Sequence, residues 1–181
     1  MIKKITKLKI NGCYKITLST FCDERGVFVK NYNYKEFKRN NLNNIWTESF
    51  FSISKKNVLR GMHFQNSPSE QYKTVMCLRG SILDVLLDLR VSSKTYLQFI
   101  SINLTEKKSE LVYMPPGIAH GFLSLTNNSI SYYNVSSLYS KKHDTGINWN
   151  SFGFHWPIKK PIISDRDNKL CNLEDFKNKF L

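Results

Sequence analysis

Long apolar runs are absent from this chain. Among its 181 residues, no window reaches the roughly 18 apolar residues that a membrane-spanning helix requires. The first ten residues also lack the continuous apolar segment of a secretory signal. We therefore expect a cytoplasmic protein that does not contact a membrane.

Cysteine is scarce. The four cysteines Cys13, Cys22, Cys77 and Cys171 show no CxxC spacing, which zinc sites and redox motifs usually carry. In a cytoplasmic protein they are expected to stay reduced and to be mostly structural. A zinc site built from them is not expected.

Acidic residues are outnumbered, since 14 Asp and Glu face 27 Lys and Arg and the formal net charge is +13. The electrostatic field of this positive net charge favours anionic partners, of which nucleic acid and a sugar nucleotide are two candidates. The basic residues, however, stand singly or in pairs such as Lys55-Lys56, whereas a nucleic-acid-binding protein concentrates them on one helix or in one tail. We therefore expect no nucleic-acid partner.

Helical periodicity is rare, and short runs rich in β-branched and aromatic residues dominate. The predicted strands are Tyr14–Leu18, Gly26–Tyr32, Phe50–Ser54, Val58–Gln65, Lys73–Leu78, Ser81–Arg90, Leu97–Leu104, Glu110–Met114, Gly121–Thr126 and Ile130–Tyr139. Two helices are predicted, Tyr34–Asn41 and Leu173–Phe180. With 41% hydrophobic residues the chain can bury one core, so we expect a single all-β domain over residues 1–181, a sandwich or barrel.

Asp84 lies in the middle of the most apolar predicted strand, Ser81–Arg90. Period-two alternation puts large apolar groups on both faces of this strand, so it is expected to be central and covered on each side. A buried carboxylate needs a partner. Either backbone groups or an arginine satisfy Asp84, or it faces a cavity and orients a cation there.

The segment Leu59 to Gln65 reads Leu-Arg-Gly-Met-His-Phe-Gln. Alternation places His63 and Gln65 on one face of the strand, as expected for a strand that lines a polar cavity. Taken alone, His63 is more often a hydrogen-bonded structural residue. Strict alternation also turns Arg60 away from His63, and a bulge near Gly61 would bring the two together.

His120 ends the segment Pro115-Pro116-Gly117-Ile118-Ala119-His120, which matches the PxGxxH signature of the cupin β-barrel. Metal-dependent cupins carry an earlier HxH motif that supplies two further ligands. Here that place reads His63-Phe64-Gln65, so the second histidine is missing. Two imidazoles without a third ligand make a weak site, and we expect no metal.

The chain as a whole resembles the dTDP-4-dehydrorhamnose 3,5-epimerases. The segments that carry the resemblance, in order and spacing, are Asp23-Glu24-Arg25-Gly26, Asn57 to Gln65, Lys73, Gly80, Asp84-Val85, Asp88-Leu89-Arg90, Pro115 to Phe122 and Gly146 to Asn150. It spans roughly Phe21 to Asp167. The resemblance implies a homodimeric cupin-like double-stranded β-helix, or jelly roll, that epimerises a nucleotide-linked 4-keto-6-deoxy sugar for bacterial surface polysaccharides, without metal or redox cofactor.

Carried over by position, the resemblance implies four catalytic residues. His63 is the base that removes the proton next to the keto group, and Asp167 orients its imidazole, with neighbouring Asp165 as an alternative. Lys73 lies near the sugar C4 oxygen. Tyr133 returns a proton from the opposite face, while Tyr132 points the other way along the strand.

A second set of residues is expected to bind the substrate. The resemblance places Arg25, Arg60 and His120 at the nucleotide diphosphate or in the sugar pocket. The further candidate substrate-binding residues are Lys30, Glu48, Phe50, Gln65, Asp84 and Asp144.

Several of these positions depart from the family pattern. Trp46 to Ser52 replaces a Phe-x-Gln-x-Asn-x-Ser stretch, Lys30 stands where a glutamate is usual, and Asp144 replaces a glutamate. A carboxylate such as Glu48 can accept two hydrogen bonds from guanine, which thymine cannot offer. One hypothesis is therefore a GDP-linked 4-keto sugar, such as a heptose, in place of a dTDP-linked one.

Four other functions stay open. A C3-only epimerase and a 3,4-ketoisomerase use the same enolate chemistry, and pocket shape decides between them and a C3/C5 epimerase. From another class, a non-catalytic cupin could simply bind sugar nucleotides, or an interaction protein could use the positively charged surface. Acid and base on facing walls argue against simple binding.

Overall fold

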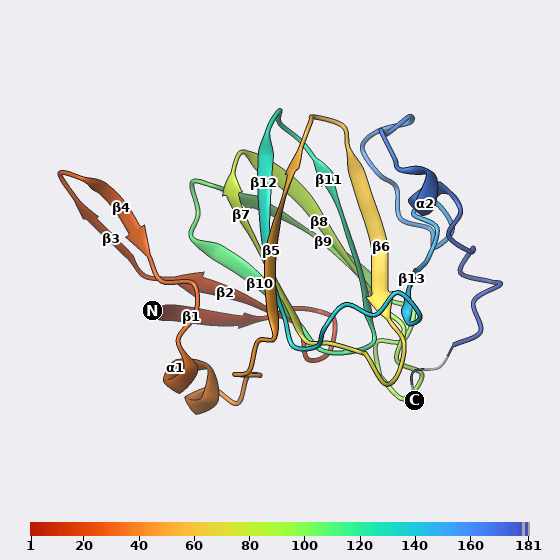
Figure 1. The fold of residues 1–181 in the computed structure, drawn as a ribbon, viewed down its shortest axis with the longest axis horizontal. Helices are drawn as coiled ribbons and strands as arrows, with labels where there is room; N and C mark the ends of the chain where they lie inside the picture. Colours follow the sequence, from red (N-terminus) through yellow and green to blue (C-terminus); the bar gives the residue numbers. More distant parts are fainter. Residues whose placement is uncertain (179, 181) are drawn as a thin grey trace.

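The computed structural model describes residues 1–178 and 180. Two antiparallel sheets face each other and form the body of the protein (Figure 1). The first has the order β1 (Ile2–Lys7), β2 (Tyr14–Leu18), β10 (Glu110–Met114), β7 (Lys73–Arg79), β12 (Ser129–Val135) and β5 (Glu48–Ser54). The second has the order β13 (Asp144–Gly146), β6 (Leu59–Gln65), β11 (Ile118–Ser124), β8 (Ser81–Asp88) and β9 (Phe99–Thr105). The predicted all-β, two-sheet architecture is confirmed.

A two-stranded hairpin of β3 (Thr20–Asp23) and β4 (Gly26–Val29) extends away from this body (Figure 1). Its strands have little interior of their own. Phe21, Val27 and Phe28 expose 68%, 68% and 64% of their surface, which is unusual for side chains of this size.

The main core lies between the two sheets and follows from the alternation of each strand. Val75 on β7 and Val112 on β10 meet Leu86 on β8 and Phe122 on β11 there. On β8, Val85 and the other alternate residues form a second cluster on the outer face, where the C-terminal segment covers them. Strand β8 is therefore buried on both sides, as predicted.

Two short helices complete the fold of the described residues. Helix α1 (Tyr34–Arg39) lies within the predicted Tyr34–Asn41, and the side chain of Asn33 caps it by accepting a hydrogen bond from the Glu36 amide. Helix α2 (Asp165–Asn168) was not predicted.

The predicted helix Leu173–Phe180 is wrong for the residues that the structure describes. Residues 173–175 form a turn and 176–178 have no regular structure, while position 179 lies outside the described residues. Leu173 and Phe176 pack against the outer face of the five-stranded sheet, and Phe180 is buried there. The helix-like spacing of these apolar residues reflects burial on a sheet.

The predicted bulge near Gly61 is present. Along β6 and β11, His63 lies opposite His120 and Arg60 lies opposite Phe122. Between these two pairs β6 advances by three residues and β11 by two, so β6 carries one extra residue. A side chain at Gly61 would come within 2.4 Å of the Gly121 backbone, and its φ of 132° suits glycine alone. The bulge turns Arg60 toward the same interior as His63.

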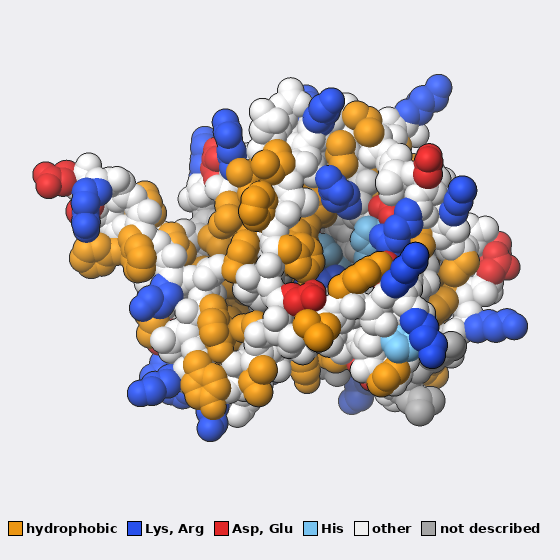
Figure 2. Space-filling model, in the orientation of Figure 1, with side chains coloured by type: hydrophobic (Ala, Val, Ile, Leu, Met, Phe, Trp, Pro, Cys, Tyr) orange, Lys and Arg blue, Asp and Glu red, His pale blue; other side chains and the backbone are white. Residues whose placement is uncertain are grey.

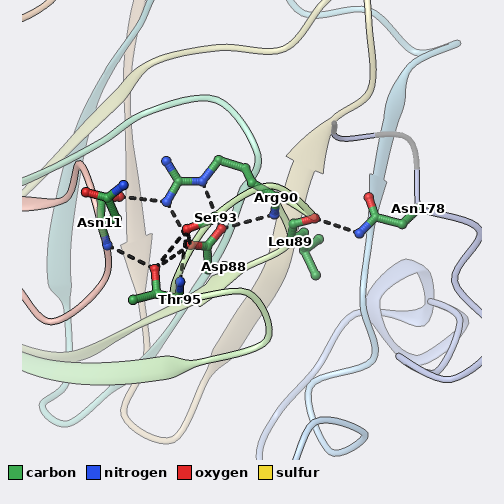
Figure 3. A network of polar contacts seen from close by, with 7 residues as sticks. All are labelled: Asn11, Asp88, Leu89, Arg90, Ser93, Thr95 and Asn178. Carbon is green, nitrogen blue, oxygen red and sulfur yellow. Dashed lines mark hydrogen bonds and ion pairs between the residues drawn. The ribbon is translucent and has the colours of Figure 1, made fainter.

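A polar network around the buried carboxylate of Asp88 joins Asn11, residues 88–95 and Asn178, whose side-chain amide donates to the Leu89 carbonyl (Figure 3). Asp88 accepts hydrogen bonds from the Arg90 guanidinium at 2.7 and 2.8 Å and from the hydroxyls of Ser93 and Thr95. Arg90 also donates to the carbonyl of Asn11, 2.6 Å away. The Asp88-Leu89-Arg90 segment of the family resemblance is thus a structural network in this protein.

Among the described residues, no helix is long and apolar enough to cross a membrane.

Candidate active site

A cavity of about 330 Å³ opens between the two sheets. Its lining residues are Glu48, Phe50, Ser52, Arg60, His63, Phe64, Gln65, Gln71, Lys73, His120, Phe122, Tyr133, Val135, Tyr139 and Asp144. Figure 2 shows a hollow on this face with histidine side chains at its floor and basic and acidic side chains around it. The fold thus brings together most of the predicted site residues.

His63 is paired with a carboxylate from the other end of the sequence. Its Nε2 lies 2.7 Å from Oδ1 of Asp167, which is only 3% exposed. The second oxygen of Asp167 accepts the backbone N–H of Gly61 at 3.1 Å, and the Ser164 hydroxyl caps the short helix that carries Asp167. Asp165, the alternative partner, is exposed on the same helix.

The environment keeps this imidazole neutral. Burial lowers the pKa of His63, and the hydrogen bond that its ring donates to Asp167 offsets only part of that effect. Burial by itself would raise the pKa of Asp167, but its hydrogen bond with His63 and their mutual attraction hold it below the usual range. Because Asp167 occupies Nε2, the ring nitrogen available for proton transfer is Nδ1.

Lys73 lies in the same cavity and is almost fully buried, with 9% of its surface exposed. Burial lowers its pKa to about 8, although attraction from Asp84 and Asp144 opposes the shift. The ammonium form therefore still dominates at neutral pH.

Asp84 and His120 form a fully buried pair across strands β8 and β11. Nε2 of His120 lies 2.6 Å from Oδ1 of Asp84. Among the described residues Asp84 accepts from neither a backbone group nor an arginine, since Oδ1 pairs with His120 and Oδ2 has no partner. It lies behind the residues that line the cavity, and its attraction for Lys73 raises the pKa of that lysine. That Asp84 orients a cation stays a prediction.

Tyr133 stands on β12, on the wall opposite the His63 strand. Burial raises the pKa of its phenol to about 12. Phe50, directly across on β5, stacks on its ring with centroids 4.8 Å apart and planes 20° apart. Tyr132 is on the other face of the strand, and its hydroxyl donates to Asn134.

The residues not predicted from the sequence include Ser52 and Tyr139, which line the cavity, and Arg166, which contacts two of the lining residues. Arg166 donates to Asp144 at 2.6 Å, and its other terminal nitrogen lies 3.0 Å from Nε2 of His63. The Tyr139 amide donates to both oxygens of Glu48 at 3.3 Å. Arg166 is adjacent to Asp167 in sequence, a signal that could have identified it.

Gln65 and Arg60 complete the β6 contribution to the cavity. The Gln65 side chain ties down the loop that follows β12, since its Oε1 accepts the Ser140 amide at 2.6 Å and its amide donates to the Leu138 carbonyl at 3.1 Å. Nε of Arg60 donates to the Ser54 hydroxyl at 3.1 Å. Both residues line the cavity as expected.

Four predicted site residues do not line the cavity. Asp84 and Asp167 lie behind it, where they bind the lining residues His120 and His63, whereas Arg25 and Lys30 are remote from the cavity of their own chain. Arg25 is at the tip of the β3–β4 hairpin, where it pairs with Asp23 and exposes 84% of its side chain. Lys30 follows β4 and borders a separate shallow hollow beside Phe21 and Phe28. Their side chains belong to the hairpin that extends from the body.

Residues 1–178 and 180 contain no group of three or more His, Cys, Asp or Glu side chains arranged to hold a metal ion. The half-buried His63 and the buried His120 each pair with one carboxylate instead.

A jelly roll that sets a neutral imidazole, a buried ammonium and a phenol around one polar cavity defines a cupin-like enzyme of the acid–base isomerase class. The family model of the dTDP-4-dehydrorhamnose 3,5-epimerases matches residues 7–175. The chain belongs to this family and is an epimerase.

Known relatives agree in sequence and in fold. The dTDP-4-dehydrorhamnose 3,5-epimerase of Methanothermobacter thermautotrophicus is 35% identical over 169 residues, which is 91% of each chain. The crystal structure of the Bacillus anthracis enzyme, with TDP and PPi bound, is 32% identical and superimposes with a TM-score of 0.91 over 94% of this chain and 99% of that one. A 3′-monoepimerase from Streptomyces bikiniensis in complex with dTDP-quinovose is 27% identical, with a TM-score of 0.87 over 92% of this chain and 86% of that one.

Proposed function

We propose that the protein inverts C3 and C5 of a 4-keto-6-deoxy sugar carried on a nucleoside diphosphate, by removing and returning protons next to the C4 ketone. The observation that carries this proposal is the placement of His63 and Tyr133 on strands of two facing sheets, with both side chains lining one cavity. Inversion needs a base on one face of the carbon and an acid on the other. Simple binding needs neither.

His63 is the proposed base, acting through Nδ1. A base must be neutral to accept a proton, and the lowered pKa of His63 keeps it so at physiological pH. Asp167 fixes the tautomer of the ring and stabilises the imidazolium that forms.

Lys73 is the proposed stabiliser of the enolate. A hydrogen next to a ketone is acidic because the developing charge moves to the carbonyl oxygen, and a donor aimed at that oxygen is typically worth about 3–4 kcal/mol. Lys73 is buried, charged and in the same cavity. The same enolate chemistry serves both carbons beside C4, so one site can invert C3 and C5.

The remaining lining residues are proposed to hold the substrate. Arg60 and His120 supply donors for the diphosphate or the sugar hydroxyls, while Asp84 orients His120. Gln65, Phe50 and Asp144 shape the pocket around them. No metal or redox cofactor takes part in the proposed reaction.

We further propose that the enzyme is a homodimer in which the β3–β4 hairpin reaches the partner's cavity. Exposed Phe21, Val27 and Phe28 give this hairpin an apolar surface that a second copy can bury. A cavity that lacks Arg25 and Lys30 from its own chain would receive them in this way.

For the base of the nucleotide, the names of the relatives favour dTDP. The alternative, GDP attached to a 4-keto sugar such as a heptose, depends on Glu48 at the cavity rim. Its two oxygens accept the Tyr139 amide at 3.3 Å, long enough for a stronger donor pair from guanine to replace it. Comparing turnover of dTDP- and GDP-linked 4-keto sugars decides between them, and a clear preference for dTDP removes the guanine hypothesis.

Solvent deuterium uptake tests the reaction itself. With a panel of nucleotide 4-keto sugars in D2O, NMR is expected to show exchange and inversion at two carbons. Exchange at one carbon would indicate the C3-only alternative, a ketone moved to C3 would indicate the 3,4-ketoisomerase, and no exchange would indicate a binding protein.

Two variants test the assignment of base and acid. We expect His63→Ala to abolish exchange, because no other group removes the proton. Tyr133→Phe is expected to keep exchange but to impair inversion at one centre. Unchanged rates in both variants would refute the proposed roles.

A further inference from the structure

Two serines lie beside the proposed proton donor on the same cavity wall. Strands β5 and β12 pair so that Ser52 is directly opposite Ser131, and Phe50 is directly opposite Tyr133. Side chains two residues apart on a strand share a face, so these four side chains all point to the interior. Ser52 lines the cavity together with Tyr133.

The hydroxyls of these two serines are buried and make no hydrogen bond to the described residues. Ser131 is fully buried, and neither Oγ has a hydrogen-bond partner among the described residues. Their neighbours along the same strands are satisfied, since Ser54 accepts from Arg60 and Ser129 lies 3.0 Å from the Ser124 hydroxyl. Buried hydroxyls are rarely left unpaired, so a role beside Tyr133 would account for this pair.

Both hydroxyls lie near the phenol, although neither is hydrogen-bonded to it in this structure. Burial raises the pKa of Tyr133, whereas the nearby hydroxyls of Ser52 and Ser131 lower it. A hydroxyl donor does this by favouring the phenolate over the phenol. The phenolate is the form that Tyr133 takes when its proton has left for the sugar carbon.

We propose that Ser52 and Ser131 are positioning residues that hydrogen-bond the Tyr133 oxygen as it gives up its proton, and so set the rate of inversion rather than of proton removal. The inference rests on the proposed role of Tyr133 as acid. In that step the Tyr133 O–H bond breaks, a C–H bond forms at the sugar carbon, and the enolate electrons restore the C4 carbonyl. The phenolate regains a proton from water, and the His63 imidazolium releases one.

The ratio of inversion to deuterium exchange tests the proposal, because His63 alone governs exchange. A neutral hydrogen bond corresponds to a factor of about 3–10. We therefore expect Ser52→Ala and Ser131→Ala each to slow inversion by about that factor, with exchange little changed. Ser52→Thr keeps the hydroxyl and should restore the ratio. Ser49→Ala, exposed on the other face of β5, is the matched control and should behave as wild type.

Two outcomes would overturn the proposal: an unchanged ratio in the double variant, or a parallel fall of inversion and exchange, which indicates general disruption of the wall. The ¹³Cζ chemical shift of Tyr133, assigned with Tyr133→Phe, gives a second readout without substrate. It should move in the double variant at neutral pH and not in Ser49→Ala. Absence of turnover in the wild type would refute the proposed function, whereas an unmoved shift would refute the hydrogen bonds themselves.

Discussion

Nε2 of His63 lies 2.7 Å from Oδ1 of Asp167, although 104 positions separate the two residues in sequence. The contact depends on a short helix that the Ser164 hydroxyl caps and on the Gly61 amide, which binds the other carboxylate oxygen. Asp167 is therefore fixed at two points, so it can hold the imidazole of His63 in one orientation. The proposed base is pre-oriented before substrate binds.

Asp167→Asn is expected to slow both deuterium exchange and inversion by about 10²–10⁴-fold, the range for a general base that has lost its orienting partner. The amide cannot stabilise an imidazolium and can impose the wrong tautomer on His63. Asp165→Asn, on the exposed side of the same helix, is the matched control and should keep full activity. Equal losses in the two variants would show that the helix, and not the carboxylate, matters.

The pH dependence of kcat/KM should have two limbs. On the acid side, activity falls as His63 becomes protonated, and because its pKa is lowered this happens below the ordinary value of 6.5. On the alkaline side, activity falls as Lys73 loses its proton near pH 8, the value to which burial lowers its pKa. Tyr133, with a pKa of about 12, stays protonated throughout this window.

Lys73→Arg tests the assignment of the alkaline limb. Arginine keeps its charge at every pH of the experiment, so the limb near 8 should disappear even where the different shape lowers the maximum rate. An alkaline limb that stays in place in this variant would assign it to another group.

Much of the site could be predicted from local sequence patterns, whereas the rest depends on contacts between segments that are distant in the sequence. The bulge at Gly61 followed from the conflict between strand alternation and the need for Arg60 beside His63, and it is present. The family resemblance favoured Asp167 over Asp165 as the partner of His63 but kept the alternative open, because a four-residue helix with weak local signals sets which of them points inward. Arg166 was missed because its partners, Asp144 and His63, come from distant strands.

The fold shows the same division between local and non-local information. Alternation alone predicted that Asp84 is buried, because the strand that carries it has apolar side chains on both faces and is covered on both sides. The segment after Leu173 has helix-like apolar spacing, yet sheet contacts determine its shape. Strand β1, at the edge of a sheet, was not predicted, because its lysines at 3, 4 and 7 interrupt the apolar alternation that marks a strand.

If the β3–β4 hairpin works in the partner's cavity, two inactive proteins should complement each other. His63→Ala disables the cavity, and the double variant Arg25→Ala with Lys30→Ala disables the hairpin. Refolded together, they should form mixed dimers with one intact site and regain exchange activity. Each variant refolded alone is the control, and light scattering reports the dimer. A mixture as inactive as its components would place the hairpin elsewhere.

Asp88 is expected to stabilise the fold without affecting catalysis. It is fully buried and binds Arg90, Ser93 and Thr95, so Asp88→Ala leaves their donors without an acceptor and should lower the free energy of unfolding by about 2–4 kcal/mol in urea. Burial by itself would raise the pKa of Asp88, but the hydrogen bonds from Arg90 bring it below its ordinary 3.8. Its contribution is therefore complete above the ordinary pKa and is lost as pH falls through the lower, folded-state value. Asp175→Asn, at an exposed carboxylate, should change stability little. A difference below about 1 kcal/mol between the two variants would mean that the network in Figure 3 contributes no more than an ordinary surface contact.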